Sequence, residues 1–300
     1  MEILSGVFEG KTTGTPISLL IRNTDQRSRD YGNIAYSYRP GHADFTFEQK
    51  YGFRDYRGGG RSSGRETAGR VAAGAIAIKL LNELGITFTT YARSIGPVEI
   101  RSFSEEEIRN NALCMPDADA AAKASAYLEQ CLNSQDSAGG VIECRIKNVP
   151  AGLGDTVFDK LDATLAHAIM SIGAVKAVEI GDGINVTRLT GSEDNDGLYR
   201  KTVLFPKPPT TQAESWEESV TAVKSYFVPI SSQPPSISQP QQTVTKDKEP
   251  LSLEIHGRHD PVIVPRAVVV VESMAAITLA DALFVNMSSQ MDKVRDFYRK

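Results

Sequence analysis

A helix expected from about Gly64 to Leu84 dictates much of the architecture of this sequence. Val71, Ala75, Ile78 and Leu81 recur at helical spacing and predict its buried face. The many alanines and glycines among them allow a neighbouring backbone to approach closely, because small side chains leave little bulk between packed elements. We therefore expect this helix to lie at the centre of the fold.

Strand-like and helix-like segments follow one another along the rest of the chain without regular βαβ alternation. Helices are expected over 104–111, 117–132, 156–172 and 267–284, and strands over 2–9, 16–22, 86–92, 97–100, 141–149 and 175–180. The helix over 156–172 is expected to bury Phe158, Leu161, Leu165, Ala168 and Ile169. This mixed order favours a layered α+β fold over a doubly wound parallel sheet.

Composition limits the kinds of partner. The 300 residues, 41% of them hydrophobic, are enough for one large domain with a buried core. A net charge of -4 argues against a nucleic-acid surface, so we expect a small-molecule ligand. The longest apolar stretch, Ala267 to Met287, is interrupted by Glu272, Ser273 and Asp281, which argues against a membrane span. With no leader-like start, these features predict a cytoplasmic protein.

The three cysteines predict neither a disulfide framework nor a metal site. Cys114, Cys131 and Cys144 are odd in number, widely spaced and without nearby histidines. We expect ordinary reduced thiols and no bound metal.

A basic stretch precedes the expected central helix. Six arginines and one histidine fall between Arg39 and Lys79, with a glycine-serine turn directly before the helix. The N–H groups of 58–60 and the hydroxyls of Ser62 and Ser63 suit anionic oxygens at the positive end of a helix, and arginines grip phosphate and carboxylate. The turn lacks the ending of a P-loop and the spacing of a Rossmann fingerprint. An anion site and a common structural turn therefore both remain open from the pattern alone.

Three motifs in order are similar to those of the chorismate synthase family: RPGHAD at 39–44, YRGGGRSSGRET at 56–67 and GRHDP at 257–261. The similarity runs from Ile3 to about Phe284 and includes VPAGLGDTVFDKLDATLAHAIMSIGAVKAVEIGDG and PRAVVVVESMAAITLADAL. It implies a single domain over 1–300 with a β-α-β sandwich, incomplete at the N-terminus, that assembles as a homotetramer.

The resemblance also implies a reaction. Members of the family convert 5-enolpyruvylshikimate 3-phosphate to chorismate by a 1,4-anti elimination of phosphate and a proton. They require reduced FMN although no net redox change occurs, and NADPH is a candidate electron source for the flavin. This chemistry belongs to the shikimate pathway of aromatic amino-acid biosynthesis, which again implies a cytoplasmic lyase.

The catalytic and substrate-binding residues are carried over by their motifs. His42 matches a histidine near the reduced flavin, where an ordinary pKa of about 6.5 suits proton donation. Asp260 matches an aspartate that assists proton removal. Arg39 and Arg65 match arginines that hold the phosphate and carboxylates of the substrate. Without the resemblance, His42 would be a structural loop histidine.

The same motifs assign the cofactor contacts. The residues that match flavin-binding positions are Arg61, Ser62, Ser63, Ser236 and Arg258. Without the resemblance, Arg258 and Asp260 would be a surface ion pair. His167 and His256 have no match and are expected to be a helix-packing and a loop residue.

One internal block, roughly 202–235, departs from the family. The codons of the glycine-rich loop Asn-His-Ala-Gly-Gly-Ile-Leu-Gly-Gly-Ile-Ser, read one base later, can encode Thr-Thr-Gln-Ala-Glu-Ser-Trp-Glu-Glu-Ser, which is the sequence of 210–219. The residues that follow back-read as Asn-Gly-Ser-Lys-Ile-Leu-Phe-Arg-Ala-Tyr-Phe-Lys-Pro-Thr-Ser, another family motif. We therefore expect 202–235 to be a frameshifted, poorly ordered segment; the alternative is an ordinary Pro/Ser-rich linker.

Two functional expectations follow. The sequence lacks the Gly-Glu-Ser-His-Gly and Arg-Arg-Arg-Pro-Gly segments of the family, and with them a catalytic histidine and several arginines. One interpretation is chorismate synthase by descent; the alternative is a catalytically inactive fragment that retains the scaffold or weak flavin binding. A generic nucleotide-phosphate module would rest on the glycine turn alone.

Overall fold

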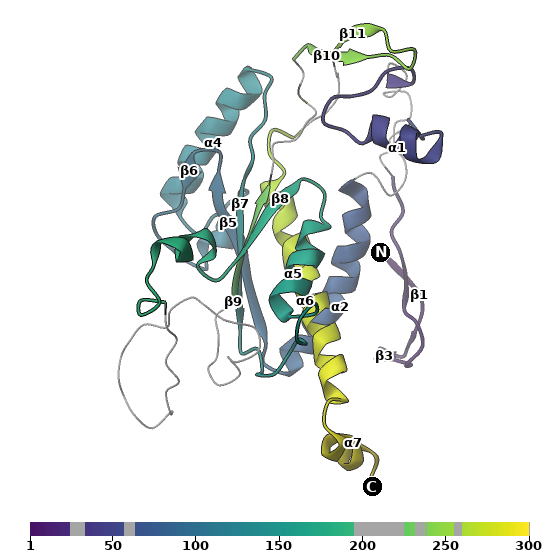
Figure 1. The fold of residues 1–300 in the computed structure, drawn as a ribbon, viewed down its shortest axis with the longest axis vertical. Coiled ribbons are helices and arrows are strands. Elements are labelled where there is room, and N and C mark those ends of the chain that lie inside the picture. The colour runs from purple at the N-terminus through teal and green to yellow at the C-terminus, as the bar shows by residue number, and fades with distance from the viewer. Residues whose placement is uncertain are drawn as a thin grey trace.

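The computed structural model describes residues 1–24, 34–56, 64–194, 225–231, 237, 239–254 and 260–299. Within these ranges the architecture is a stack of layers, with helices packed on a sheet (Figure 1).

The main layer is a five-stranded sheet in the order β6-β5-β7-β9-β8. Its strands are β5 (Thr87–Ile95), β6 (Val98–Glu99), β7 (Gly140–Lys147), β8 (Val175–Ile180) and β9 (Ser225–Ser231). Every neighbouring pair is antiparallel. The predicted α+β class is therefore confirmed, and a doubly wound parallel sheet is excluded.

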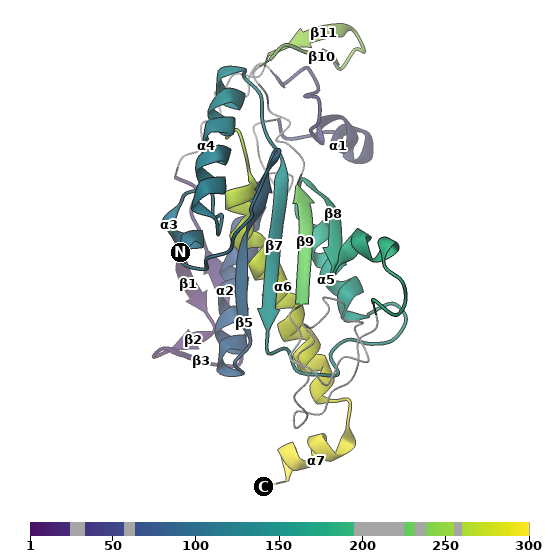
Figure 2. The same cartoon turned by 90° about the vertical axis from the view of Figure 1, so that its left-hand side faces the viewer.

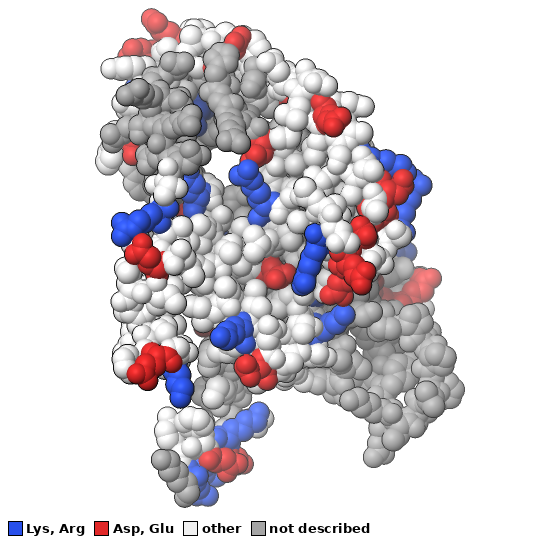
Figure 3. Space-filling view, turned by 180° about the vertical axis from the view of Figure 1, so that it is seen from behind, with Lys and Arg blue, Asp and Glu red and all other residues white. Residues whose placement is uncertain are grey.

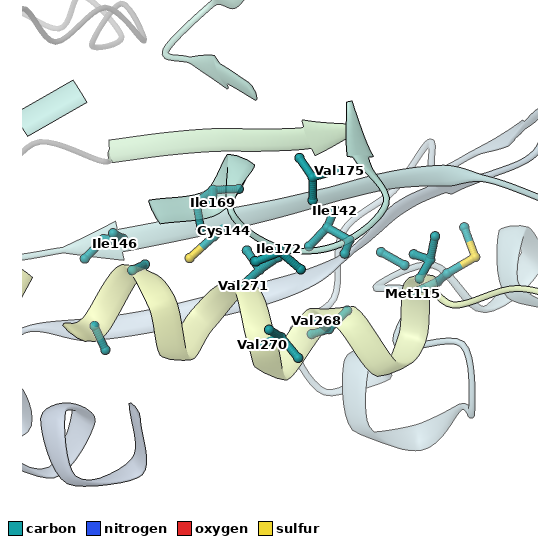
Figure 4. Packing of buried hydrophobic residues seen from close by; sticks show 14 of the residues in the cluster. Met115, Ile142, Cys144, Ile146, Ile169, Ile172, Val175, Val268, Val270 and Val271 are labelled. Atoms are coloured by element: carbon teal, nitrogen blue, oxygen red, sulfur yellow. The ribbon is translucent and has the colours of Figure 1, made fainter. Parts of the chain in front are cut away.

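Three helices cover one face of this sheet: α2 (Thr67–Glu83), α5 (Leu161–Met170) and α6 (Val264–Met287) (Figure 2). The apolar side chains of Ile142, Cys144 and Ile146 project from β7 into the core. Val268 and Val271 of α6 belong to the same core cluster (Figure 4). Among the described helices only α6 has the length and apolarity to cross a membrane. Its contribution to this core explains that composition.

A second, smaller layer lies on the other side of α2 (Figure 1). It consists of β1 (Glu2–Ser5) paired with β4 (Ser18–Leu20), and β2 (Val7–Phe8) paired with β3 (Lys11–Thr12). The helices thus lie between the main sheet and two separate two-stranded sheets. At one edge of the main sheet, α4 (Ala118–Asn133) follows the short α3 (Glu107–Asn110) and adds its alanine-rich face to the core.

The predicted central helix is confirmed, but its buried face is partly wrong. Leu81 is buried as expected, whereas Ala75 is exposed. The buried residues of α2 are instead Ala72, Gly74 and Ala77, together with Leu81. The smallest side chains face inward because α2 packs closely against α6.

The helix expected over 156–172 is shorter than predicted. Phe158 lies before α5 and is 85% exposed. Gly154 and Val157 have positive φ, at 86° and 69°, and such backbone cannot belong to an α-helix. His167 is exposed, so its predicted role in helix packing is wrong.

The segment expected to be aberrant, 202–235, lies mostly outside the described residues. The described part is β9, which pairs with β7 on one side and β8 on the other. The prediction that 202–235 is a frameshifted, poorly ordered segment therefore stays a prediction.

Candidate active site

The described motif residues belong to segments that lie toward one end of the molecule. Arg39 and His42 directly precede α1 (Asp44–Tyr51), Arg65 lies in η3 (Gly64–Glu66) ahead of α2, and Asp260 precedes α6. Figure 1 shows α1 at the end where both α2 and α6 begin. Motifs more than 200 residues apart in the sequence are thus brought to the same end of the fold.

Basic and acidic side chains are interspersed over the face of the molecule shown in Figure 3. The described part of this face carries no single-sign field, so recognition of an anion depends on individual cations.

His42 and Arg39 are held in a single tight turn. The His42 N–H donates to the Arg39 carbonyl at 3.3 Å, and Gly41 between them has a φ of 69°, which glycine adopts readily. The half-buried His42 ring has its Nδ1 2.9 Å from the Pro40 carbonyl oxygen. Because a carbonyl only accepts, Nδ1 carries a hydrogen and Nε2 is the ring atom that can exchange a proton.

Asp44 holds Arg39 through three contacts. The Arg39 N–H donates to Asp44 Oδ2 at 3.1 Å, Nε donates to the same oxygen at 2.8 Å, and Nη2 donates to Oδ1 at 2.9 Å. Burial alone would raise the pKa of Asp44, but the hydrogen bonds and charge of Arg39, with that of Arg54, lower it to about 2. The carboxylate therefore stays charged at neutral pH.

Asp44 also belongs to a row of alternating positive and negative side chains. Arg54 Nη1 lies 2.9 Å from Asp44 Oδ2, and Arg54 Nε lies 3.5 Å from Glu48 Oε2. At the other end of this row, Lys246 Nζ lies 2.9 Å from Glu48 Oε1. Arg54 is only 4% exposed and also donates through Nη2 to the carbonyls of Ile34 and Ser37. We call these five residues the ion-pair cluster: Lys246, Glu48, Arg54, Asp44 and Arg39.

A distant hairpin fixes this cluster in place. Strands β10 (Gln241–Val244) and β11 (Pro250–Leu253) pair with each other. Tyr38 N–H donates to the Val244 carbonyl at 3.2 Å, and Lys246 N–H donates to the Tyr36 carbonyl at 2.9 Å. Neither this hairpin nor Lys246 was predicted from the sequence. The string RPGHAD did contain Asp44, but its role requires the structure.

Asp260 is anchored to the start of β7 through its neighbours. The Ala138 N–H donates to the Pro261 carbonyl at 2.7 Å, and Ala138 forms a parallel bridge with Val262. The Asp260 side chain is 44% exposed and its Oδ1 lies 2.9 Å from Arg266 Nη2. Asp260 is therefore a carboxylate at the entrance to α6 with a cation beside it.

The remaining predicted site residues are less defined. Arg65 is exposed at the amino end of α2. The predicted flavin contacts lie outside the described residues: Arg61, Ser62, Ser63, Ser236 and Arg258.

The described residues contain no cluster of three or more His, Cys, Asp or Glu suited to a metal ion. The three cysteines are free thiols, and burial raises the pKa of Cys144.

Comparisons with known proteins agree with the arrangement of the motifs. The family profile described as chorismate synthase matches residues 1–284. Chorismate synthase of Agathobacter rectalis is 58% identical over 302 residues, covering 100% of this chain and 82% of the relative. That of Lachnoclostridium phytofermentans is 57% identical, covering 100% and 83%. A crystal structure of chorismate synthase superposes with a TM-score of 0.72 at 31% identity, covering 98% of this chain and 81% of that one.

Proposed function

Because the chain belongs to the chorismate synthase family, we propose that it catalyses the 1,4-anti elimination of phosphate from 5-enolpyruvylshikimate 3-phosphate, giving chorismate. The reaction makes it a lyase of the shikimate pathway, which leads to aromatic amino acids. The observation that carries the proposal is the turn that holds a cation, Arg39, and a proton-exchanging group, His42, side by side.

Arg39 and Arg65 hold the anionic groups of the substrate. The Arg39 guanidinium has five N–H donors, and Asp44 accepts two of them. The edge turned away from Asp44 matches the geometry of a phosphate or carboxylate. Arg65 adds a second cation at the amino end of α2, where the helix dipole also favours negative charge.

His42 and Asp260 manage protons. Nε2 of His42 is the exchanging atom, because the Pro40 carbonyl occupies Nδ1. The Asp260 carboxylate assists removal of the proton that the substrate loses with its phosphate. The C–O bond to phosphate and one C–H bond break, and a new C=C bond forms, so no net oxidation occurs.

The described residues fit a phosphorylated cofactor. The long helix α2 begins at this end without a side-chain cap, and its positive dipole end suits a phosphate. We propose that this cofactor is FMN, held by Arg61, Ser62, Ser63, Ser236 and Arg258. When bound in its reduced form, the flavin supplies the electron density that promotes loss of phosphate. NADPH is the proposed electron donor that keeps it reduced.

The proposal extends to assembly and location. Family membership supports a small-molecule substrate. We propose that the chain forms a homotetramer, acts in the cytoplasm and binds neither nucleic acid nor membranes. Sedimentation of the purified protein tests the tetramer, since a single species of monomer mass would contradict it.

An anaerobic assay tests the activity. The purified chain is mixed with reduced FMN and 5-enolpyruvylshikimate 3-phosphate, and both phosphate and chorismate are measured. Equal amounts of the two products are expected. Binding of substrate without release of phosphate would reject the activity and identify an inactive scaffold.

A further inference from the structure

We propose that Asp44 is a positioning residue that fixes the guanidinium of Arg39 for the anionic substrate. This inference rests on the proposed function, in which Arg39 binds the substrate. It adds a residue whose action is indirect, because Asp44 works through the orientation of Arg39.

The contacts define the orientation of Arg39 closely. Asp44 accepts from Nε and Nη2, which form one edge of the planar guanidinium, and also from the Arg39 backbone N–H. Three bonds from one carboxylate to one residue fix both its backbone and its side chain. The opposite edge, which includes Nη1, is then directed away from Asp44 and keeps the fork geometry that an anion needs.

Arg54 fixes Asp44 in turn. Its side chain is 4% exposed, and its Nη2 donates to the Ile34 and Ser37 carbonyls at 2.6 Å each. An arginine tied to two carbonyls cannot follow a moving carboxylate, so Asp44 is held from behind. Side-chain exposure rises from 4% at Arg54 to 18% at Arg39, which is the more accessible of the two arginines.

The charge of the cluster supports a binding role. Among the described ion pairs of this cluster, three cations, Lys246, Arg54 and Arg39, face two anions, Glu48 and Asp44, so one positive charge is left over. A purely structural network gains little from burying so many charges, because desolvation offsets their attraction. The cluster therefore has an excess positive charge, and Arg39 lies at one end of the row of ion pairs. Recognition of an anion requires such a charge.

A double-mutant cycle with the full chain and FMN tests the role. Titration calorimetry measures the Kd of 5-enolpyruvylshikimate 3-phosphate for the parent, Asp44→Asn, Arg39→Gln and the double variant. Asp44→Asn should weaken binding on the order of tenfold, the size expected when a charged hydrogen bond is misplaced. In the Arg39→Gln background, the same change should leave Kd unaltered. Equal weakening in both backgrounds, or an unchanged Kd in the parent background, would overturn the proposal.

Glu143→Gln is the matched control. Glu143 also lies between two arginines, 2.7 Å from Arg145 and 3.7 Å from Arg93, and its side chain is 8% exposed against 9% for Asp44. It belongs to β7 and not to the motif segments. Its loss should lower thermal stability without altering Kd, and a matching loss of affinity would contradict a specific role for Asp44.

Two further outcomes separate this inference from the proposed function. If Asp44→Asn does not fold, Asp44→Glu keeps the charge and displaces the carboxylate; severalfold weaker binding in the parent background alone is then expected, and unchanged binding overturns the inference. If the parent binds substrate but releases no phosphate, the proposed function fails while the cycle still decides the role of Asp44. A parent chain that binds no substrate overturns both.

Discussion

Gly74 of α2 lies directly against Ser273 of α6. A Cβ atom added at Gly74 would fall 2.6 Å from the Cα of Ser273, closer than real side chains approach. Ser273 is buried and its hydroxyl donates to the Val269 carbonyl of its own helix at 2.7 Å, so its polar group is satisfied. Two small residues therefore set the spacing of the central helices.

Replacing Gly74 by alanine should destabilise the protein. The added methyl group must push α2 and α6 apart, and such overpacking costs about 1–3 kcal/mol. Urea unfolding measures the change. Gly69→Ala in the same helix is the control, because Gly69 has nothing within 4 Å of an added Cβ. There the higher helix propensity of alanine should stabilise by roughly 0.5–1 kcal/mol, and a loss of stability at both sites would contradict the packing explanation.

A second prediction concerns Asp117, whose carboxylate joins α4 to the preceding loop. It accepts from four backbone N–H groups, those of Asp119 and Ala120 in α4 and of Arg101 and Ser102 in the loop. These bonds, that from Arg101 first, hold the pKa of Asp117 well below its usual range. Asp117→Ala should lower the melting temperature at pH 7 because four donors lose their acceptor.

The pH dependence of this effect has a defined sign. The folded pKa is lower than the unfolded one, so the stabilisation is fully present above about pH 4, the ordinary range of an aspartate, and is lost as pH falls through the folded value. The difference in melting temperature between parent and Asp117→Ala should therefore shrink in acid. Asp119→Ala is the control: its side chain is 74% exposed and, among the residues that the structure describes, pairs with Lys123 on the surface. A difference that grows in acid would refute the assignment.

Periodicity predicted where the main elements lie, because helix and strand spacing are local properties of a sequence. The helix from Gly64 to Leu84 and the strand Val175–Ile180 are both present. The buried face of α2 could not be read from hydrophobicity, since closeness to α6 selects Gly74 over Ala75. Residues Leu165 and Ile169 face the core, which places His167 on the opposite side of α5.

The candidate site residues could be predicted only where a motif marked them, and their roles stay predictions. Arg39 and His42 were predicted from the resemblance to a family, and their segment lies at the end of the fold where α2 and α6 begin (Figure 1). Asp44 lies within the motif, but its bonds to Arg39 need the folded turn, and the Lys246–Glu48 contact spans about 200 residues of sequence. Such pairings leave no local pattern.

A third prediction tests His42 as the proton-exchanging residue. His42→Asn keeps a polar side chain near the Pro40 carbonyl but has no titrating nitrogen. Turnover should fall at least about a hundredfold, the usual contribution of a general acid or base, while the Kd of the substrate changes little. His167→Asn on the exposed face of α5 is the control and should leave turnover intact. A large loss of affinity with unchanged turnover would assign His42 to binding instead.

The last prediction concerns the segment 202–235, which we propose to be a frameshifted reading. Strand β9 lies between β7 and β8, yet it contains Pro229. Proline has no N–H for a ladder and is disfavoured in a strand with neighbours on both sides. On the β7 side, the ladder pairs Val141 with Ile230 and Cys144 with Phe227, and within the described residues it has no pair in between. On the β8 side, Pro229 is paired with Val178. The family-like frame reads Ile-Leu-Phe-Arg-Ala-Tyr-Phe over this strand, with alanine in place of the proline.

Restoring the family-like frame in two halves should separate stability from cofactor binding. The restored strand half, 220–235, should raise the free energy of unfolding by about 1 kcal/mol, since one ladder hydrogen bond becomes available. The restored loop half, 210–219, removes the carboxylates of Glu214, Glu217 and Glu218, which we propose repel the flavin phosphate. Quenching of FMN fluorescence should then show tighter binding. A glycine-serine loop of equal length controls for charge alone, and an unaltered flavin affinity in the restored loop would refute its proposed role.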